Sequence, residues 1–181
     1  HLPFRRACFN YVIAVGELLN HADYSKTLVE ISEALTPRGK LILEIDMKWR
    51  GDDLSMLLDM IIGRRLGYAA TDEEIRALFK SGTRGSDLTW GITRTEAVRL
   101  HWFTYPEIRR AVSEAHLQLV QVSGVNMLSG LIPLIVQQRT RSRWLRKVSA
   151  ILNHLDSFLS KSRAVKMLAG NLVIVCEKRD D

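Results

Sequence analysis

The chain has 181 residues, of which 46% are hydrophobic and 25% charged, with a net charge of +6. This balance is typical of one globular domain and excludes a disordered chain. No apolar run is long enough to span a membrane and the start shows no signal-peptide pattern, so we predict a cytoplasmic protein. Cys8 and Cys176 lie in apolar segments without metal-ligand spacing, and we interpret both as core residues in a reducing compartment.

Strand and helix patterns alternate over the first third of the chain. A continuous apolar run over residues 9–16 predicts a buried strand, and residues 23–35 predict a helix with Asp23 as its N-cap. Residues 40–46 predict a second buried strand. Helical spacing then returns over 54–68 and 71–80.

The middle of the chain begins with a glycine-containing loop over residues 81–86. Apolar and polar side chains alternate over 95–103, which predicts a strand. Thr104 and Glu107 then form a capping-box pattern that opens a helix running to about His116.

The last third is expected to contain two strands, over residues 117–125 and 171–178, separated by the mostly helical segment 128–169. That segment has an apolar face made of Trp144, Val148, Ile151, Leu152, Leu155 and Phe158. Strand–helix alternation of this kind predicts a three-layer α/β architecture, with residues 1–181 forming a single domain.

Four segments carry a family resemblance: Leu2-Pro-Phe4 with FNYVI at 9–13, LTPRGKLIL at 35–43, FTYPEI at 103–108, and NLVIV at 171–175. In this order they resemble the carboxyl-terminal half of class I S-adenosylmethionine-dependent methyltransferases. The resemblance covers essentially the whole chain. It implies a partial Rossmann-like methyltransferase fold containing strands 4, 5, 6 and 7 of the family in the order 4-5-7-6, with the last strand antiparallel.

The sequence departs from the family pattern at three single positions. Asn10 stands where aspartate is usual, and Arg38 and His116 stand where glycines are usual. A larger departure is that no G-x-G-x-x-G-like turn follows a strand, although the family uses such a turn to approach the cofactor. The fragment would also leave the first strand, residues 9–16, as an open apolar edge, which favours self-association.

The resemblance implies a cofactor-binding role for residues near the first strand. The backbone around Val15 and Gly16 would meet the methionine portion of S-adenosylmethionine, with Glu17 nearby. Leu2 and Pro3 would lie close to the adenine. For Glu17, a hydrogen bond to loop amides is the alternative interpretation.

His21, Asp46 and His101 are the candidates on the side of the methyl acceptor. His21 is the candidate general base, because its unperturbed pKa lies near neutrality, although a loop histidine bonded to the backbone has the same pattern. Asp46 and His101 are candidate substrate-binding residues. The alternatives are that Asp46 only ends its strand and that His101 is a solvated or core-bonded ring. No metal ligand set is expected.

Five basic residues crowd into a short stretch of the helical segment: Arg139, Arg141, Arg143, Arg146 and Lys147. One interpretation of residues 139–158 is a lid that also touches an anionic membrane or an RNA. The interpretation we favour is that the apolar face packs on the sheet and the charges are solvated. Nucleic-acid binding is therefore not expected.

The functional hypothesis is methyl transfer from S-adenosylmethionine to a small or lipophilic acceptor by the complete protein, with the fragment itself inactive. The helical insert 128–169 would act as a substrate lid. Two alternatives stay open: a non-catalytic α/β binding module and an RNA-modifying methyltransferase. A hydrolase is disfavoured because the sequence has no G-x-S-x-G nucleophile turn.

Overall fold

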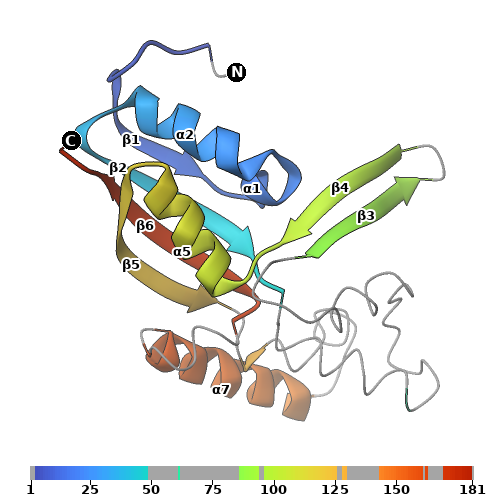
Figure 1. Cartoon of the computed structure of the whole chain (residues 1–181). Helices are drawn as coiled ribbons and strands as arrows, with labels where there is room; N and C mark the ends of the chain where they lie inside the picture. Colours follow the sequence, from blue (N-terminus) through green and yellow to red (C-terminus); the bar gives the residue numbers. More distant parts are fainter. Residues whose placement is uncertain are drawn as a thin grey trace.

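The computed structural model describes residues 3–48, 61, 86–93, 96–125, 128–129, 143–160, 162 and 169–180 (Figure 1). The helices expected over 54–68 and 71–80 lie outside these residues, apart from Ile61. The loop expected over 81–86 also lies outside them, except for Ser86, which begins a strand.

The amino-terminal elements follow the sequence prediction closely. They are β1 (Phe9–Ala14), α1 (Leu18–His21), α2 (Tyr24–Ala34) and β2 (Leu35–Asp46). The predicted N-cap is confirmed, because the Asp23 carboxylate accepts the Lys26 N–H at 3.2 Å. Strand β1 is two residues shorter than expected, and α1 replaces part of the connection that follows it.

The next two strands form a hairpin that projects from the main sheet (Figure 1). β4 (Glu96–Trp102) confirms the strand predicted from alternation, and it pairs antiparallel with β3 (Ser86–Thr93). β3 was not predicted. It begins inside the segment that the sequence indicated as a loop.

The remaining elements of the core confirm the sequence prediction. α5 (Tyr105–Glu114) opens with the predicted capping box between Thr104 and Glu107. β5 (Leu117–Val125) and β6 (Asn171–Lys178) have the expected bounds.

The four core strands form one sheet in the order β1-β2-β6-β5. β1 and β2 run parallel, whereas β6 is antiparallel to both β2 and β5. This is the order that the resemblance implies for strands 4-5-7-6 of the methyltransferase fold. The sheet therefore joins elements from both ends of the chain.

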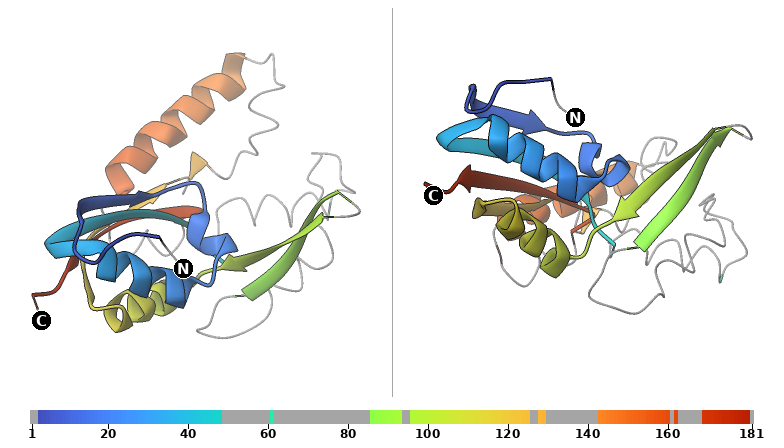
Figure 2. Two further views of the ribbon diagram at one scale, coloured as in Figure 1. Left: turned by 90° about the horizontal axis from the view of Figure 1, so that it is seen from above. Right: turned by 45° about the horizontal axis from the view of Figure 1, so that its top comes forward.

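One face of the sheet packs against the hydrophobic core. Cross-strand pairs of β2 and β6 are fully buried there: Leu41 with Cys176, Leu43 with Ile174, and Ile45 with Leu172. Helices α2 and α5 cover this face (Figure 2). Because alternate residues of a strand point to opposite faces, Tyr11 and Ile13 of β1 face the other side, where they are exposed.

The expected third layer is not formed within the described part of the chain. α7 (Arg143–Leu159) lies on the side of the sheet opposite α2 and α5, but it points away from the sheet (Figure 2). Its apolar face is exposed, with 68% of Trp144 and 83% of Phe158 open to solvent. The prediction that this face packs on the sheet is therefore wrong.

Two of the three departures from the family pattern have a clear conformational outcome. Arg38 and His116 adopt φ values of 59° and 57°, the left-handed conformation that glycine takes most easily. Asn10 accepts a hydrogen bond from the Thr36 hydroxyl at 2.9 Å, across the turn that precedes the long part of β2.

The two cysteines differ in burial. Cys176 is buried in the core as expected, but Cys8 is exposed, so its prediction as a core residue is wrong. Cys8 lies before β1, where its backbone N–H donates to the Ala34 carbonyl at the end of α2.

Candidate functional site

The parallel strands β1 and β2 bring their carboxyl ends to the same edge of the sheet, where open α/β sheets bind ligands. Immediately after β1, Gly16 and Glu17 have φ values of 75° and 63°. Two consecutive left-handed residues turn the chain sharply and end the strand. The turn is held to β2 because the Gly16 N–H donates to Glu44 Oε2 at 3.2 Å.

Helix α1 follows this turn and places two of the candidate residues side by side. His21 Nε2 lies 3.9 Å from Glu17 Oε2, one helical turn away. The two side chains are 34% and 43% exposed, so both remain open to solvent and to a ligand. An imidazole that is accessible in this way can accept a proton from a bound molecule.

The other two candidates, Asp46 and His101, meet through a residue that sequence reasoning missed. Asn20 of α1 is buried, and its Nδ2 donates to the carbonyl oxygens of Asp46 at 3.1 Å and of His101 at 2.6 Å. Its Oδ1 accepts the Asp46 N–H at 3.0 Å. A single amide side chain thus joins α1, β2 and β4.

The side chain of His101 points into a cluster at the start of α5. His101 Nε2 lies 3.2 Å from Glu107 Oε1, and both side chains are only 12–13% exposed. The Tyr24 hydroxyl donates to the same Glu107 oxygen at 3.3 Å. The rings of Tyr24, His101 and Phe103 pack against one another with centroid separations of 4.7–5.1 Å.

Buried charge marks the end of β2. Asp46 is 6% exposed, and its carboxylate accepts a hydrogen bond from the Asn171 amide of β6. Lys48, two residues later, is 1% exposed. Burying ionised groups is costly unless they are compensated, so such positions are often functional.

The cofactor candidates have different surroundings. Val15 is 56% exposed, and Gly16 and Pro3 are exposed as well, whereas Leu2 lies outside the described residues. A Cβ placed on Gly16 would meet no heavy atom within 4 Å, so a ligand can approach this backbone closely.

Three residues of this region were not selected from the sequence as site residues: Asn20, Tyr24 and Lys48. The one available signal was the pattern Leu-Leu-Asn at 18–20, in which a polar amide continues an apolar run. Glu107 was recognised for its capping role alone.

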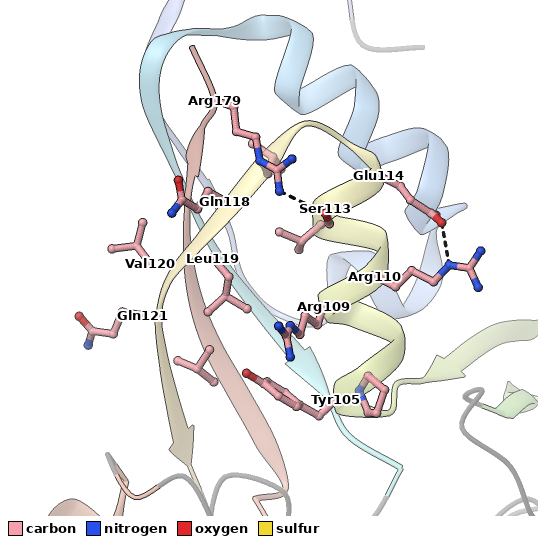
Figure 3. Close-up of a pocket in the computed structure, with 14 residues that line it drawn as sticks. Tyr105, Arg109, Arg110, Ser113, Glu114, Gln118, Leu119, Val120, Gln121 and Arg179 are labelled. Atoms are coloured by element: carbon pink, nitrogen blue, oxygen red, sulfur yellow. Dashed lines mark hydrogen bonds and ion pairs between the residues drawn. The ribbon is translucent and has the colours of Figure 1, made fainter. Parts of the chain in front are cut away.

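A separate groove lies at the opposite edge of the sheet, between α5 and β5 (Figure 3). Its cavity volume is about 1370 Å³. Arg109, Tyr105 and Leu119 line it from the two elements, and Arg179 closes one end, where its guanidinium donates to the Ser113 hydroxyl at 3.1 Å. None of the predicted site residues lines this groove, so it is distinct from the strand-end site.

Metal-ligand and membrane-spanning patterns are absent from the parts of the chain that the structure describes. No group of three or more His, Cys, Asp or Glu side chains is placed there to hold a metal ion. No helix in the same ranges has the length and apolar character needed to cross a membrane.

No protein-family model matches the sequence, and no curated protein matches it either. Solved structures do match. An S-adenosylmethionine-dependent methyltransferase from Methanosarcina mazei aligns with 100% of this chain and 64% of its own, at 11% identity and a TM-score of 0.52. A structure from Listeria monocytogenes, assigned to the same class, aligns with 99% of this chain and 65% of its own, at 10% identity and a TM-score of 0.51.

The chain carries part of a methyltransferase fold. At this level of identity the likeness concerns the fold alone. The partial methyltransferase fold spans just under two thirds of the length of these two structures. Within this fold, the strand-end site at β1 and β2 occupies the edge at which open α/β sheets bind their ligands.

Proposed function

We propose that the complete protein transfers a methyl group from S-adenosylmethionine to a small or lipophilic acceptor. The observation that carries this proposal is the sheet order β1-β2-β6-β5 with an antiparallel β6. The fold likeness over the whole chain supports it. In this proposal the chain supplies the half of the fold that contains strands four to seven.

The residues present fit one part of the cofactor. The exposed backbone of Val15 and Gly16, together with Glu17, would hold the methionine portion, and Pro3 and Leu2 would lie by the adenine. The sequence contains no glycine-rich turn after a strand for the rest of the cofactor. We therefore propose that the 181-residue chain alone has little or no affinity for S-adenosylmethionine.

On the acceptor side, we propose His21 as the general base for an acceptor that must lose a proton. Its solvent-accessible ring and the neighbouring Glu17 carboxylate support this role. Asp46 and His101 are proposed as substrate-binding residues. Their low exposure favours contacts from the wall of the acceptor site, which Asn20 holds in place.

Titration calorimetry with S-adenosylhomocysteine tests the cofactor proposal. The chain is compared with a protein extended by whatever its gene encodes upstream of His1. We expect the extended protein alone to bind. Binding by the short chain would mean that the cofactor site is built from different residues, and binding by neither protein would reject the methyltransferase function.

The base proposal is tested in the extended protein with His21→Asn. We expect methyl transfer to a proton-losing acceptor to fall about a hundredfold with unchanged cofactor affinity, since general bases contribute roughly 10²–10⁴-fold. His154→Asn, at an exposed position of α7, is the matched control and should leave the rate unchanged. An unchanged rate for His21→Asn rejects the base role.

A non-catalytic binding module is the second candidate function, and the groove between α5 and β5 favours it. β5 ends the sheet, so its outer edge offers backbone groups to an added strand. Arg109 and Arg179 give the groove a positive lining. This candidate replaces the first one if neither protein binds S-adenosylhomocysteine.

A further inference from the structure

Helix α7 carries a narrow stripe of large apolar side chains that face solvent. Trp144, Ile151, Leu155 and Phe158 are 68%, 59%, 41% and 83% exposed. With Val148, they follow one another at alternating steps of four and three residues, which places them on one side of the helix. Contiguous exposed apolar surface of this kind marks a site of interaction.

The orientation of the stripe is fixed by hydrogen bonds on another face of the helix. The Asp156 carboxylate is buried and accepts the backbone N–H groups of Leu128 at 2.7 Å and Ser129 at 3.0 Å. The Ser129 hydroxyl also donates to it, at 2.5 Å. At roughly 100° per residue, Asp156 lies about a third of a turn from the stripe. Anchoring Asp156 inward therefore turns the stripe outward.

The attachment of α7 also leaves most of its length clear of the sheet. The Gly124 N–H of β5 donates to the Ser160 carbonyl at 3.2 Å, just beyond the end of the helix. From this point α7 extends away, on the side opposite α2 and α5 (Figure 2). A flat partner can thus approach the stripe without meeting the sheet.

The charges of α7 indicate the chemistry of that partner. Arg143, Arg146 and Lys147 are exposed near the helix start, whereas Asp156, the one acidic residue in the helix sequence, is buried. Cations at this end oppose the helix macrodipole, whose positive pole is the amino terminus. An external anionic surface would stabilise both these cations and the positive pole of the helix. Arg143 and Lys147 lie along one side of the apolar stripe, away from Asp156, as the spacing of the helix requires.

We propose that α7 binds the surface of an anionic lipid bilayer. The helix would lie in the plane of the interface with Trp144 and Phe158 buried at the boundary of the acyl chains, and Arg143 and Lys147 would contact lipid phosphates. A stripe of large apolar side chains, an aromatic residue near each end and neighbouring cations are the features of interfacial helices. The proposal is independent of the methyltransferase function.

Co-sedimentation of the whole chain with vesicles tests the proposal. We expect binding to vesicles of equal parts phosphatidylcholine and phosphatidylglycerol, and much weaker binding to pure phosphatidylcholine. The double variant Arg143→Gln/Lys147→Gln should lose about twenty-five-fold in partitioning to the anionic vesicles, at roughly fivefold per charge. Ile151→Ser/Phe158→Ser should lose tenfold or more on either vesicle, on the order expected for two apolar side chains.

Matched exposed positions on α2 provide the control. Lys26→Gln/Val29→Ser removes one charge and one exposed apolar side chain there, and it should leave vesicle binding unchanged. All of these positions are exposed, so circular dichroism should show the same fold for each variant.

Three results would overturn the proposal. The first is no vesicle binding by the native chain, and the second is equal loss in the α2 control and the α7 variants. The third is a dimer, or an RNA complex, that the α7 variants disrupt while vesicle binding is absent. That result would assign the stripe to a second copy or the cations to RNA.

Discussion

The side chain of Asn20 makes to Asp46 the two hydrogen bonds that a neighbouring strand would make. Its Oδ1 accepts the Asp46 N–H at 3.0 Å, and its Nδ2 donates to the Asp46 carbonyl at 3.1 Å. The same Nδ2 donates to the His101 carbonyl at 2.6 Å. Asn20 therefore closes the gap between the end of β2 and the end of β4, where the candidate site lies.

Replacing Asn20 by alanine should destabilise the protein strongly. The Asp46 N–H and the His101 carbonyl lose the hydrogen bond with Asn20, and the Asp46 carbonyl keeps the Phe103 N–H at 3.2 Å. An unsatisfied buried group costs about 1–3 kcal/mol. Since water will reach some of them, we expect the free energy of unfolding to fall by roughly 2–4 kcal/mol in urea titrations. Asn153→Ala, at an exposed position of α7, should stay within about 0.5 kcal/mol of the native chain. Equal effects of the two changes would contradict the prediction.

His116→Gly should stabilise the chain or leave it unchanged. His116 has a φ of 57° at the end of α5, and a non-glycine residue costs about 1–2 kcal/mol in this conformation. Glycine removes that cost but adds roughly 0.5–1 kcal/mol of backbone entropy to the unfolded chain. We expect a small rise in Tm by calorimetry.

The neighbouring Ala115 provides the opposite case, because its φ is −85° and nothing is strained there. Ala115→Gly also deletes a buried methyl group, so Tm should drop. A clear destabilisation by His116→Gly, similar to that by Ala115→Gly, would show that the histidine ring contributes more than its conformation costs.

The order of the sheet could be predicted because local patterns and the family resemblance agreed. Segments rich in apolar residues marked β1, β2, β5 and β6, and the resemblance supplied the order and the antiparallel last strand. The caps at Asp23 and Thr104 are local as well, since each depends on residues within one helical turn.

Other features depend on contacts between distant parts of the chain, which a single sequence does not reveal. Asn20 meets a residue 26 positions away and another 81 positions away. The outward direction of the α7 stripe follows from Asp156 binding Leu128 and Ser129. Periodicity correctly predicted an apolar stripe on α7, but it did not indicate whether this stripe would be buried or exposed.

The Asp23 cap gives a third prediction. Asp23→Ala removes the acceptor of the Lys26 N–H in the first turn of α2, which should lower the free energy of unfolding by about 1 kcal/mol. Asp23→Asn keeps a capping oxygen and should cost only a few tenths of that amount. If both variants lose the same stability in urea titrations, the charge of Asp23 matters and its capping bond does not.

The two cysteines should differ sharply in reactivity, because the thiolate is the reactive form. Burial raises the pKa of the Cys176 thiol from 9.0 to about 12, whereas Cys8 is exposed. At pH 8, a disulfide reagent such as Ellman's should therefore label one thiol in the native chain and two after unfolding. Cys8→Ser should abolish native labelling, and Cys176→Ala should leave it intact. Fast native labelling of the Cys8→Ser variant would contradict the burial of Cys176.

The same pKa difference predicts a loss of stability at alkaline pH. The Cys176 thiol holds its proton in the folded chain up to about pH 12 but releases it near pH 9.0 in the unfolded chain. The contribution of this pKa difference to the free energy of unfolding is thus fully present below pH 9 and declines as the pH rises from 9 towards 12.

Lysines and tyrosines titrate in the same range, so the informative quantity is the difference between variants. The fall in the free energy of unfolding from pH 8 to pH 10.5 should be smaller for Cys176→Ala than for Cys8→Ser. Equal falls would mean that the thiol at 176 ionises alike in both states.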